Sequence, residues 1–474
     1  MVSAEVGPWV RETDAADAVA SLSKALRQLG HNVTVLAPRH PGFEAGGLMA
    51  ARRLTPLSLP DAAEVTVFDA QLPSGVQLTL FDAPVLFDRP GVYGEGGKEY
   101  PDNAKRFGLL SVVAAALVRA RGQQGQAFDI VHLHDAPAAL VPLALRRIPG
   151  PALPTVLTIH DATRQGSFPL KEADALGIPK DVASDDSVRL NNKLNVLKAG
   201  MSFADAITTV SPHYAEEMAT EARSGALAEL VRALKTPLVG VANGIDYGVF
   251  NPATDAALDA RYDAEDPANK GREKTALLRR LELELDVERP LVVAVAELGK
   301  EQGMDLVAGA LSTLLKQDLS LVVAGSGAAG IAKRFETAQS KHRDRFLWLP
   351  EVDSQMYRRL HAAADIAIVP ARHAPSAAGQ LVAARYGAVP VVHASGGLVD
   401  SVVDADAKLT TGTGFLFDDD TVDGLVGAVE RALAAYRSPA FAKLRRRVMR
   451  LDLSWDRPAR RYLQIYRQTI GSTA

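Results

Sequence analysis

The sequence predicts an α/β fold in which strands and helices alternate through both halves of the chain. In the first half, residues 16–29 carry leucines at helical spacing, Gly30 ends that helix, and an apolar strand follows at residues 33–36. In the second half, residues 364–403 contain two short apolar runs separated by a segment of helical composition. Short apolar runs of this kind are typical of parallel strands that are buried on both faces. We therefore expect doubly wound sheets in both halves.

The stretch at residues 364–403 shows the alternation most clearly. Its strand, polar loop, helix and second strand are expected at residues 365–370, 372–376, 380–386 and 389–393. Gly387 suits the position just past a helix end. Ser395-Gly396-Gly397 then opens a further helix, where backbone N–H groups could receive an anion. Taken alone, the stretch is interpreted as two ordinary turns of a doubly wound sheet.

Length and composition limit the classes of protein to consider. The chain has 474 residues, enough for two or three domains, with 47% hydrophobic and 23% charged residues. Its net charge of −3 argues against nucleic-acid binding, which usually needs a basic surface. The absence of cysteine excludes disulfides and thiolate metal sites. No apolar run approaches the ~20 residues that span a membrane, and no signal peptide is evident, so a cytoplasmic protein is expected.

The first residues of the chain indicate an incomplete element. Residues 1–5 resemble the end of a strand whose beginning is missing. We therefore expect a shortened central strand and a translation start that is placed late. The loop at residues 7–14 follows this strand, and loops at the carboxyl ends of strands form the ligand crevice in open α/β sheets. Arg11 lies in this loop and is a candidate ligand-binding cation.

Two further strands of the first half end in polar residues. The strand at residues 129–134 contains His132 and His134 on one face and leads to Asp135. Because no third ligand is evident, packing in the core or a cleft is favoured over metal binding for the two histidines. The strand at residues 155–160 ends on His160, which places that side chain toward the crevice.

Several segments of the second half carry weaker signals. Residues 261–290 are charged and helical, and we interpret them as a solvated face. A buried strand is expected at residues 291–296, and another at 321–324. The latter leads into Gly325-Ser326-Gly327, a weak phosphate-binding signal. A terminal helix is expected at residues 459–466.

Five groups of motifs, in a fixed order along the chain, resemble bacterial glycogen synthases and plant starch synthases. They are Tyr100-Pro101-Asp102-Asn103 with Arg106-Phe107, Phe203-Ala204-Asp205 with Thr209-Val210-Ser211-Pro212, Asn243-Gly244-Ile245-Asp246, Phe250-Asn251-Pro252-Ala253-Thr254-Asp255, and Ser454-Trp455-Asp456-Arg457. The family's segments occur in its order from residue 3 to residue 467. Several ordered matches are specific where any one of them would be weak.

The resemblance implies a fold, a reaction and a domain plan. The fold is GT-B, with two Rossmann-like doubly wound domains facing a cleft. The reaction is retaining transfer of glucose from ADP-glucose to the non-reducing end of an α-1,4-glucan, without metal or cofactor. Residues 1–240 would form the acceptor side, 241–455 the nucleotide-sugar side, and 456–474 a helix that crosses back to the first domain. The implied partners are a nucleotide-sugar and an α-glucan.

The resemblance also assigns site residues to positions of this chain. His160, followed by Gln165-Gly166, matches a motif whose histidine lies at the catalytic centre, and Asp135 matches the aspartate of a second motif. Arg11 keeps the positive charge of a lysine that meets the sugar-nucleotide. The remaining donor-binding candidates are the glycine-turn residues Gly325, Ser326, Ser395, Gly396 and Gly397.

Several family positions are replaced. The Arg and Lys expected after the first strand of the second domain are Glu297 and Gln302, and the cleft glutamate is Ala374. Thr13 and Asp14 stand where the family has two glycines, and Arg164 stands where it has an aromatic residue within the motif of His160. Without a metal, the leaving diphosphate depends on Arg, Lys and helix N-termini, and losing one such donor typically slows a reaction ~100- to 1000-fold. The replacements therefore predict an impaired or inactive enzyme.

Other functions stay open at this point. The chain could be an active retaining glycosyltransferase with another donor or acceptor, because His160, Asp135 and Arg11 are kept. It could also be a non-catalytic module that binds glucan or a protein partner, or an ordinary glycogen synthase whose register differs from the one assumed. A dehydrogenase is poorly supported, since no Gly-x-Gly-x-x-Gly follows a strand with an acidic residue about 20 positions on.

Overall fold

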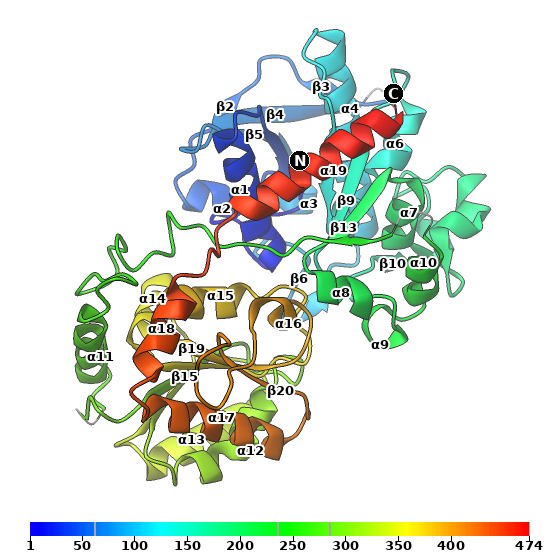
Figure 1. The fold of residues 1–474 in the computed structure, drawn as a ribbon. Helices are drawn as coiled ribbons and strands as arrows, with labels where there is room; N and C mark the ends of the chain where they lie inside the picture. The colour runs from blue at the N-terminus through cyan, green and yellow to red at the C-terminus, as the bar shows by residue number, and fades with distance from the viewer. Residues whose placement is uncertain (61–62, 235–236, 284–285, 474) are drawn as a thin grey trace. The chain divides into compact units, whose positions relative to one another are not determined.

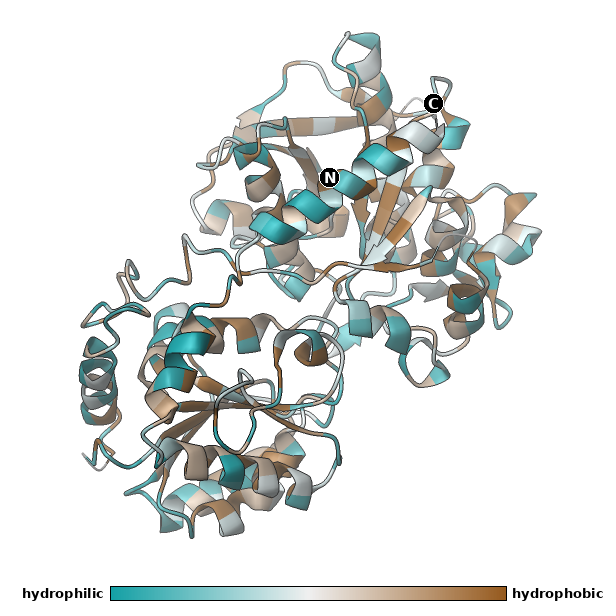
Figure 2. Cartoon of the chain, viewed as in Figure 1, coloured by the Kyte–Doolittle hydropathy of each residue, from teal (hydrophilic) through white to brown (hydrophobic). Residues whose placement is uncertain are grey.

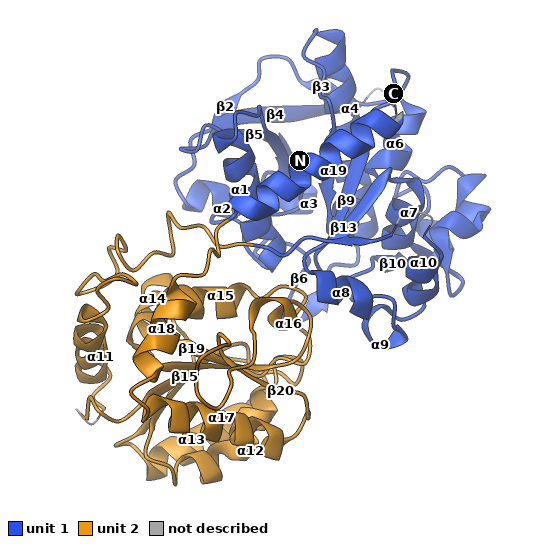
Figure 3. Ribbon diagram, in the orientation of Figure 1, with its two compact units in different colours: residues 1–243, 455–474 blue, residues 244–454 orange. Residues whose placement is uncertain are grey.

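The computed structural model describes residues 1–60, 63–234, 237–283 and 286–473. They form two compact units: the first contains residues 1–243 and 455–474, and the second contains residues 244–454 (Figure 3). In each unit, helices flank a sheet of mostly parallel strands (Figure 1). Hydrophobic residues concentrate on the central strands, and hydrophilic residues lie on the outer faces of the helices (Figure 2). The predicted α/β fold with two doubly wound halves is confirmed.

The sheet of the first unit is parallel in its centre and antiparallel at one edge. Its strands are β1 (Thr34–Pro38), β2 (Ala51–Arg52), β3 (Leu57–Ser58), β4 (Glu64–Gln71), β5 (Gln77–Asp82), β8 (Val131–His134), β9 (Thr155–Ile159), β13 (Ala206–Thr209) and β14 (Val239–Gly240). β1 pairs with β5 in parallel, and β8, β9, β13 and β14 pair in parallel in that order. Val2 bridges both Leu36 and Leu133, so the first residues of the chain lie between β1 and β8.

The helices of the first unit cover this sheet. They are α1 (Asp14–Gln28), α2 (Pro41–Ala45), α3 (Pro84–Phe87), α4 (Asn103–Gln123), α5 (Asp135–Ala138), α6 (Val141–Arg147), α7 (Val196–Phe203), α8 (Pro212–Glu217), α9 (Glu221–Ser224), α10 (Leu227–Ala233) and α19 (Asp456–Thr473). α1 begins where Thr13 accepts a hydrogen bond from the Ala15 amide, and its buried face includes Leu22 and Leu26. The terminal helix α19 packs Tyr462 into the same cluster.

Short elements complete the first unit at its surface. Two small antiparallel sheets are formed by β6 (Gly94–Glu95) with β7 (Lys98–Glu99), and by β10 (Ser167–Phe168), β12 (Lys193–Asn195) and β11 (Arg189–Leu190). Single 3-10 turns lie at Leu170–Glu172, Val182–Ser184 and Asp186–Val188. In the described part of the chain, none of the helices is both long and apolar enough to cross a membrane.

The second unit has a fully parallel sheet. Its strands are β15 (Leu291–Val295), β16 (Ser320–Ala324), β17 (Phe346–Leu349), β18 (Ile366–Val369), β19 (Val389–His393) and β20 (Phe415–Phe417). Their order in the sheet is β17-β16-β15-β18-β19-β20. The chain therefore reverses its direction of winding between β15 and β18. In open α/β sheets the loops that follow two such strands form the ligand crevice.

The helices of the second unit connect these strands. They are α11 (Asn269–Arg280), α12 (Met304–Leu314), α13 (Ala329–Lys341), α14 (Ser354–Ala363), α15 (Ala378–Arg385), α16 (Gly397–Ser401), α17 (Val422–Tyr436) and α18 (Phe441–Met449). β19 has the bounds predicted from the sequence. Gly387 follows α15 with a positive φ of 75°, a conformation that favours glycine.

The prediction of a solvated face for residues 261–290 holds for Arg272, Arg279 and Arg280 of α11, which are exposed, but it is wrong for three other charged residues of this helix. Residues 284–285 of this range lie outside the described residues. Lys270, Glu273 and Lys274 lie in this helix and are only 2%, 2% and 4% exposed. The Lys274 ammonium forms an ion pair with Asp365, its Nζ lying 2.7 Å from Oδ2. The charged residues were assigned to solvent from composition alone, whereas their partners lie on elements far away in the sequence.

Lys270 shows the physical reason most clearly. Its ammonium donates to the backbone oxygens of Ala362 and Tyr386, each 2.8 Å away, and to that of His361 at 3.3 Å. The acceptors lie at the carboxyl ends of α14 and α15, where backbone oxygens lack helical partners and carry partial negative charge. A buried lysine therefore caps two helices at once, which a periodicity argument cannot detect.

Candidate functional site

The structure brings the two predicted catalytic residues of the first unit together. Asp135 directly follows β8, and His160 directly follows the neighbouring strand β9. The Asp135 carboxylate accepts a hydrogen bond from the His160 backbone amide, with an N···Oδ1 distance of 2.6 Å. Asp135 has a φ of 58°, which is unusual for a residue with a side chain and turns the chain sharply as β8 ends.

Burial sets the charge state of this pair. Asp135 is 8% exposed, and desolvation raises the pKa of its carboxyl group to about 7, although the His160 amide opposes the shift. His160 is 6% exposed, and desolvation lowers the pKa of its imidazole to about 4 against the opposing charges of Asp14, Glu5 and Asp161. At neutral pH His160 is therefore uncharged, and Asp135 is close to the midpoint of its titration.

His132 and His134 form a row with His160 behind the ends of the strands. The ring centroids of His132 and His134 are 4.2 Å apart, and His134 Nδ1 lies 3.0 Å from His160 Nε2. His132 contacts the hydroxyls of Thr158 at 2.6 Å and of Tyr466, from α19, at 2.7 Å. Both histidines are 2% exposed, so the interpretation of packing in the core is confirmed. Within the described ranges, no three His, Asp or Glu residues gather as metal ligands.

A buried glutamate organises the loop before α1. The Glu5 carboxylate accepts the backbone amides of Glu12 and Thr13 at 2.6 and 2.9 Å, and the Tyr93 hydroxyl at 2.8 Å. Burial raises the pKa of Glu5, and these hydrogen bonds oppose the shift. The sequence argument did not identify Glu5. The sequence pattern that could have identified it is an acidic residue among the apolar residues that end the first strand. Acidic residues are rarely buried in this way unless their charge has partners.

Arg11 lies in the same loop and is exposed. Its guanidinium forms an ion pair with Asp17 of α1, with a distance of 2.8 Å between the nitrogen and the carboxylate oxygen. The side chains of Glu12 and Asp14 are also exposed. The backbone is nevertheless anchored, because Glu5 binds the amides of Glu12 and Thr13.

A small cavity of about 40 Å³ lies beside Asp135. Its lining includes Thr13, Tyr93 and Arg164, together with Gly166. The Arg164 guanidinium lies over the Tyr93 ring, 5.3 Å from its centroid, a favourable cation–π arrangement. The cavity thus combines one cation and one phenol with two carboxyl groups, those of Glu99 and Asp135, of which that of Asp135 titrates near neutrality.

In the second unit, Glu297 and Gln302 lie on the loop that follows β15. Glu297 and Lys300 are exposed, whereas Gln302 is half-buried against Gly299. Gly303 ends the loop as the N-cap of α12, with a φ of 69°. A Cβ at Gly303 would lie 1.9 Å from the Pro370 oxygen, so this glycine is required where the loop passes the end of β18.

Gly325 and Ser326 lie at the corresponding end of β16. Gly325 has a φ of 135°, and a Cβ there would approach the Ala296 oxygen to 1.9 Å. The Ser326 oxygen accepts the Leu298 amide at 2.8 Å, which extends the pairing of β15 and β16 by a few residues. The close approach of two backbones thus accounts for Gly325, while the Ser326 side chain is exposed.

The turn Ser395-Gly396-Gly397 packs against the loop that contains Ala374. The Gly397 amide donates to the Ala374 oxygen at 2.8 Å, and the Ser395 hydroxyl donates to the Ala371 oxygen at 2.6 Å. Gly396 has a φ of 46°, and a Cβ there would lie 2.0 Å from the Ala374 oxygen. Ala374 itself is 8% exposed. The two predicted positions therefore lie side by side, and the Gly397 amide already has an acceptor.

Arg372 is a further residue of this edge that the sequence argument left inside a polar loop. Its guanidinium forms ion pairs with Asp305 of α12 and with Asp420, each with a closest distance of 2.6 Å. It also donates to the Lys300 oxygen at 2.5 Å. The hydrogen bond to Asp305 is the largest cause that raises the pKa of Arg372, and the hydrogen bond to Asp420 acts in the same direction. The arginine thus fastens the loop after β18 to the loop after β15.

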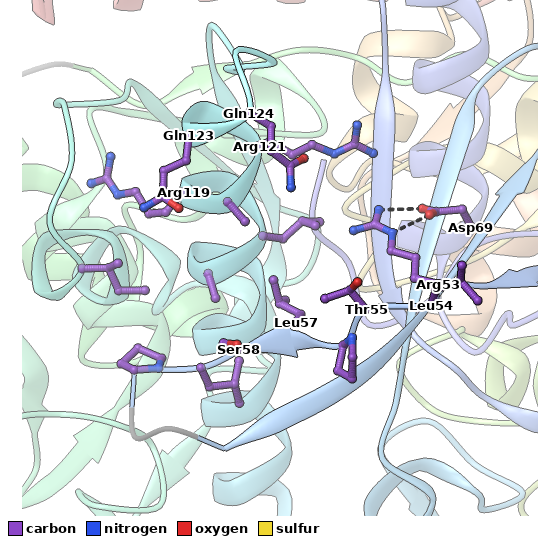
Figure 4. Close-up of a pocket in the computed structure, with 17 residues that line it drawn as sticks. Arg53, Leu54, Thr55, Leu57, Ser58, Asp69, Arg119, Arg121, Gln123 and Gln124 are labelled. Atoms are coloured by element: carbon purple, nitrogen blue, oxygen red, sulfur yellow. Dashed lines mark hydrogen bonds and ion pairs between the residues drawn. The ribbon is translucent and has the colours of Figure 1, made fainter.

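The first unit also contains a wide cavity of about 800 Å³ between α4 and residues 53–60 (Figure 4). Its arginines are engaged: Arg53 binds the Asp69 carboxylate through two nitrogens, and Arg119 donates to the oxygens of Leu145 and Pro151. This cavity shares no lining residue with the small cavity beside Asp135, and none of the predicted site residues lines it.

Comparison with known proteins gives two family matches. Residues 1–233 match the model described as starch synthase catalytic domain, and residues 279–448 match the model described as glycosyl transferases group 1. Curated relatives named glycogen synthase include that of Anaeromyxobacter dehalogenans strain 2CP-1, 38% identical over 98% of both chains. Another, from Anaeromyxobacter sp. strain Fw109-5, is 39% identical over 98% of both chains.

Solved structures give a consistent result. The catalytic domain of starch synthase IV from Arabidopsis thaliana, bound to ADP and acarbose, is 27% identical and superposes with a TM-score of 0.87, covering 99% of this chain and 98% of that one. Sucrose-phosphate synthase from Thermosynechococcus elongatus is 18% identical with a TM-score of 0.61 and the same coverage, which shows a shared fold only. The fold is GT-B.

Proposed function

The chain belongs to the glycogen synthase family of glycosyltransferases, and from this premise we propose that it is a divergent member whose transfer of glucose from ADP-glucose to an α-1,4-glucan is impaired. In this proposal, residues 1–240 hold the glucan acceptor, 241–455 hold the nucleotide-sugar, and 456–474 support the first domain. His160 and Asp135 belong to the catalytic centre. No metal or cofactor takes part.

The loop after β15 carries the proposal. The family has Arg and Lys where this loop has the exposed Glu297 and the half-buried Gln302. A like charge about 4 Å from a phosphate costs about 1 kcal/mol in water and about 4 kcal/mol at the effective dielectric of a protein surface. The lost attraction adds a comparable amount, and each lost donor typically slows the reaction ~100- to 1000-fold. Lys300 can replace one cation but cannot also cancel Glu297.

Other contacts of the predicted donor-binding residues support the proposal. Arg11 is paired with Asp17, and the Thr13 amide is bonded to Glu5 at the position of a family glycine. The Gly397 amide is bonded to the Ala374 oxygen. Each of these donors would have to give up a present partner before it could bind a phosphate oxygen.

A second candidate is an active retaining glycosyltransferase with another donor or acceptor. The observation that favours it is the cavity beside Asp135, where Arg164 stands in place of the family's aromatic residue and stacks on Tyr93. Such an exchange changes what the acceptor side can recognise while Asp135 and His160 keep their arrangement. A non-catalytic module that binds glucan or a protein partner is the outcome if neither activity is found.

The test is transfer of labelled glucose from ADP-glucose to glycogen by the purified full chain. We expect little or no transfer by the wild type and partial recovery in the triple variant Glu297→Arg, Gln302→Lys and Ala374→Glu. The triple variant raises the net charge by two, so Glu336→Arg, an exposed position of α13 with the same change in charge, is the matched control. It should recover nothing.

The outcomes separate the candidates. Transfer by the wild type at an ordinary glycogen synthase rate would overturn the proposal of impairment. If neither the wild type nor the triple variant transfers glucose, binding is measured instead. Nucleotide-sugars are then titrated into the protein, and glycogen binding is tested by co-sedimentation. Binding of another nucleotide-sugar would favour the second candidate, whereas glycogen binding alone would favour a binding module.

A further inference from the structure

Two adjoining cavities lie over one face of α4 in the first unit. The wide cavity of about 800 Å³ is joined by a second cavity of about 500 Å³. α4 contributes apolar residues to both cavities at helical spacing, namely Leu109 and Val112 to the second cavity and Ala116 and Ala120 to the wide one. The cavities adjoin because they have three lining residues in common, which are Leu59, Pro60 and Ile148.

The spacing of the two cavities along α4 matches a repeat of the α-helix. The α4 residues of one cavity are about seven to eight positions from those of the other, which is about 11 Å along the helix axis. Two side chains at i and i+7 of a second helix lie on one face, about 10.5 Å apart. A helix lying along α4 can therefore place one apolar side chain in each cavity, as in helix-in-groove recognition.

The charges that line the cavities are mostly positive, although the whole chain has a net charge of −3. Arg53 and Asp69 neutralise each other in an ion pair. Figure 4 shows Arg119 and Arg121 projecting from α4 to opposite sides of the wide cavity. Among the described residues, four cations that line the cavities have no carboxylate partner, and these are Lys105, Arg119, Arg121 and Arg147.

The arginines of this group are held by uncharged acceptors. Arg119 donates to the backbone oxygens of Leu145 and Pro151, at 2.9 and 2.5 Å. Arg147 donates to the backbone oxygen of Gly177 at 2.6 Å. A backbone oxygen orients a guanidinium group without neutralising its charge. The positive charge over α4 therefore stays available to an acidic partner, and the only unpaired carboxylate in the described lining is that of Asp174.

Leu54 adds an apolar contact at the wide cavity. It lines this cavity, and its relative exposure of 102% means that nothing in the described chain covers it. Covering a leucine side chain completely strengthens binding by about ten- to a hundredfold. The surface thus offers a partner two cavities, an exposed leucine and four unneutralised cations.

We propose that this face of α4 is a docking surface for an acidic amphipathic helix of a protein partner. Apolar side chains at i and i+7 of that helix enter the two cavities, and its Asp and Glu residues pair with the four cations. The proposal does not rest on the proposed function, because none of the predicted site residues lines either cavity. Failure of the glucose-transfer assay would therefore leave it standing.

The test is fluorescence anisotropy of a labelled probe peptide titrated with the purified full chain. The probe is a peptide of about 16 residues, or about 24 Å of helix, made of alanine and glutamate with leucines at i and i+7. One comparison peptide has lysine in place of each glutamate. The other has the same composition but carries its second leucine at i+5, on the opposite face. We expect both to bind at least tenfold more weakly than the probe, and the affinity of the probe to fall as salt is added.

Variants of the chain locate the binding. Leu54→Ser should weaken binding of the probe about tenfold. Lys105→Glu, at an exposed position of the second cavity, should weaken it about three- to tenfold at low ionic strength. Lys193→Glu is the matched control, because this lysine is exposed in the same unit and lines neither cavity, and it should leave binding unchanged. All three positions are exposed, and thermal unfolding checks that each variant folds.

Several results would overturn the inference. The probe might fail to bind, either comparison peptide might bind as tightly, or both Leu54→Ser and Lys105→Glu might leave binding unchanged. Two other occupants are tested alongside. Competition with the probe by maltoheptaose would assign this face to a glucan. A dimer in sedimentation experiments that Leu54→Ser dissociates would assign it to a second copy of the chain.

Discussion

Asp135→Asn should change how the stability of the first unit depends on pH. The free energy of unfolding of the variant, compared with that of the wild type at the same pH, should be higher at high pH than at low pH. Burial raises the pKa of Asp135 from 3.8 to about 7, so the folded protein resists ionisation of this carboxyl group. Asparagine keeps an oxygen that can accept the His160 amide, now 2.6 Å from Oδ1. It also tolerates the φ of 58° better than most residues.

The sign and size of the effect follow from linkage. Between pH 3.8 and pH 7 the folded state holds the Asp135 proton that the unfolded state has lost, so wild-type stability falls as pH rises through this window. Each pKa unit corresponds to about 1.4 kcal/mol. From pH 5 to pH 8 the wild type should therefore lose about 3 kcal/mol that the variant does not lose. A constant cost of about 1–3 kcal/mol for the amide's unpaired N–H groups does not change this difference.

The assay is urea unfolding followed by tryptophan fluorescence in a Trp348→Phe background. The remaining tryptophans, Trp9 and Trp455, both lie in the first unit, so the signal reports that unit. Asp129→Asn, at an exposed position just before β8, is the control and should change stability equally at both pH values. If the free-energy difference between Asp135→Asn and the wild type were the same at pH 5 and pH 8, the burial argument would be refuted.

Two further predictions concern the second unit. Gly396→Ala should destabilise it by about 1–3 kcal/mol, because the new Cβ would meet the Ala374 oxygen at a residue with a positive φ. The control Gly427→Ala adds a Cβ in open space on α17 and should stabilise the unit by up to about 1 kcal/mol. Urea unfolding followed by Trp348 fluorescence measures both free energies of unfolding, and equal changes would contradict the packing argument. Lys270→Met should cost about 1–3 kcal/mol and speed hydrogen exchange at the ends of α14 and α15, since it removes one of two donors that they share, the other being the Tyr262 hydroxyl. Unchanged exchange there would show that Lys270 does not cap these helices.

The sequence predicted the architecture well because the signals for it are local. The apolar run at residues 389–393 coincides with β19, and the helix expected at residues 380–386 is α15, which runs from Ala378 to Arg385. A strand buried on both faces must be apolar throughout, and glycine is favoured just past a helix end, so such elements can be identified from a few neighbouring residues. The boundaries shift by one or two residues because helix ends fray.

The errors arose where one residue's environment comes from a distant segment. Lys270 appeared solvated because its neighbours in the sequence are charged, but its acceptors Ala362 and Tyr386 are about a hundred positions away. Glu5 was missed for the same reason, since its partner Tyr93 lies in another loop. Asp135 and His160 were each placed at the carboxyl end of a predicted strand, because strand ends can be identified locally, and the structure shows that these two strands are neighbours.

The structure also changes how much weight the kept residues carry for function. Gly325 and Gly396 are each required by a backbone that passes within about 2 Å of where a Cβ would stand, so the fold alone accounts for them. Their presence therefore says nothing about whether a nucleotide-sugar binds. Asp135 and His160 differ, because burying a carboxyl group whose pKa is raised to about 7 costs stability that packing does not require. Under the proposed function this pair belongs to the acceptor side, whereas the replaced Glu297 and Gln302 belong to the donor side. Recovery of transfer by the triple variant would then be the direct consequence of an acceptor side that kept its chemistry.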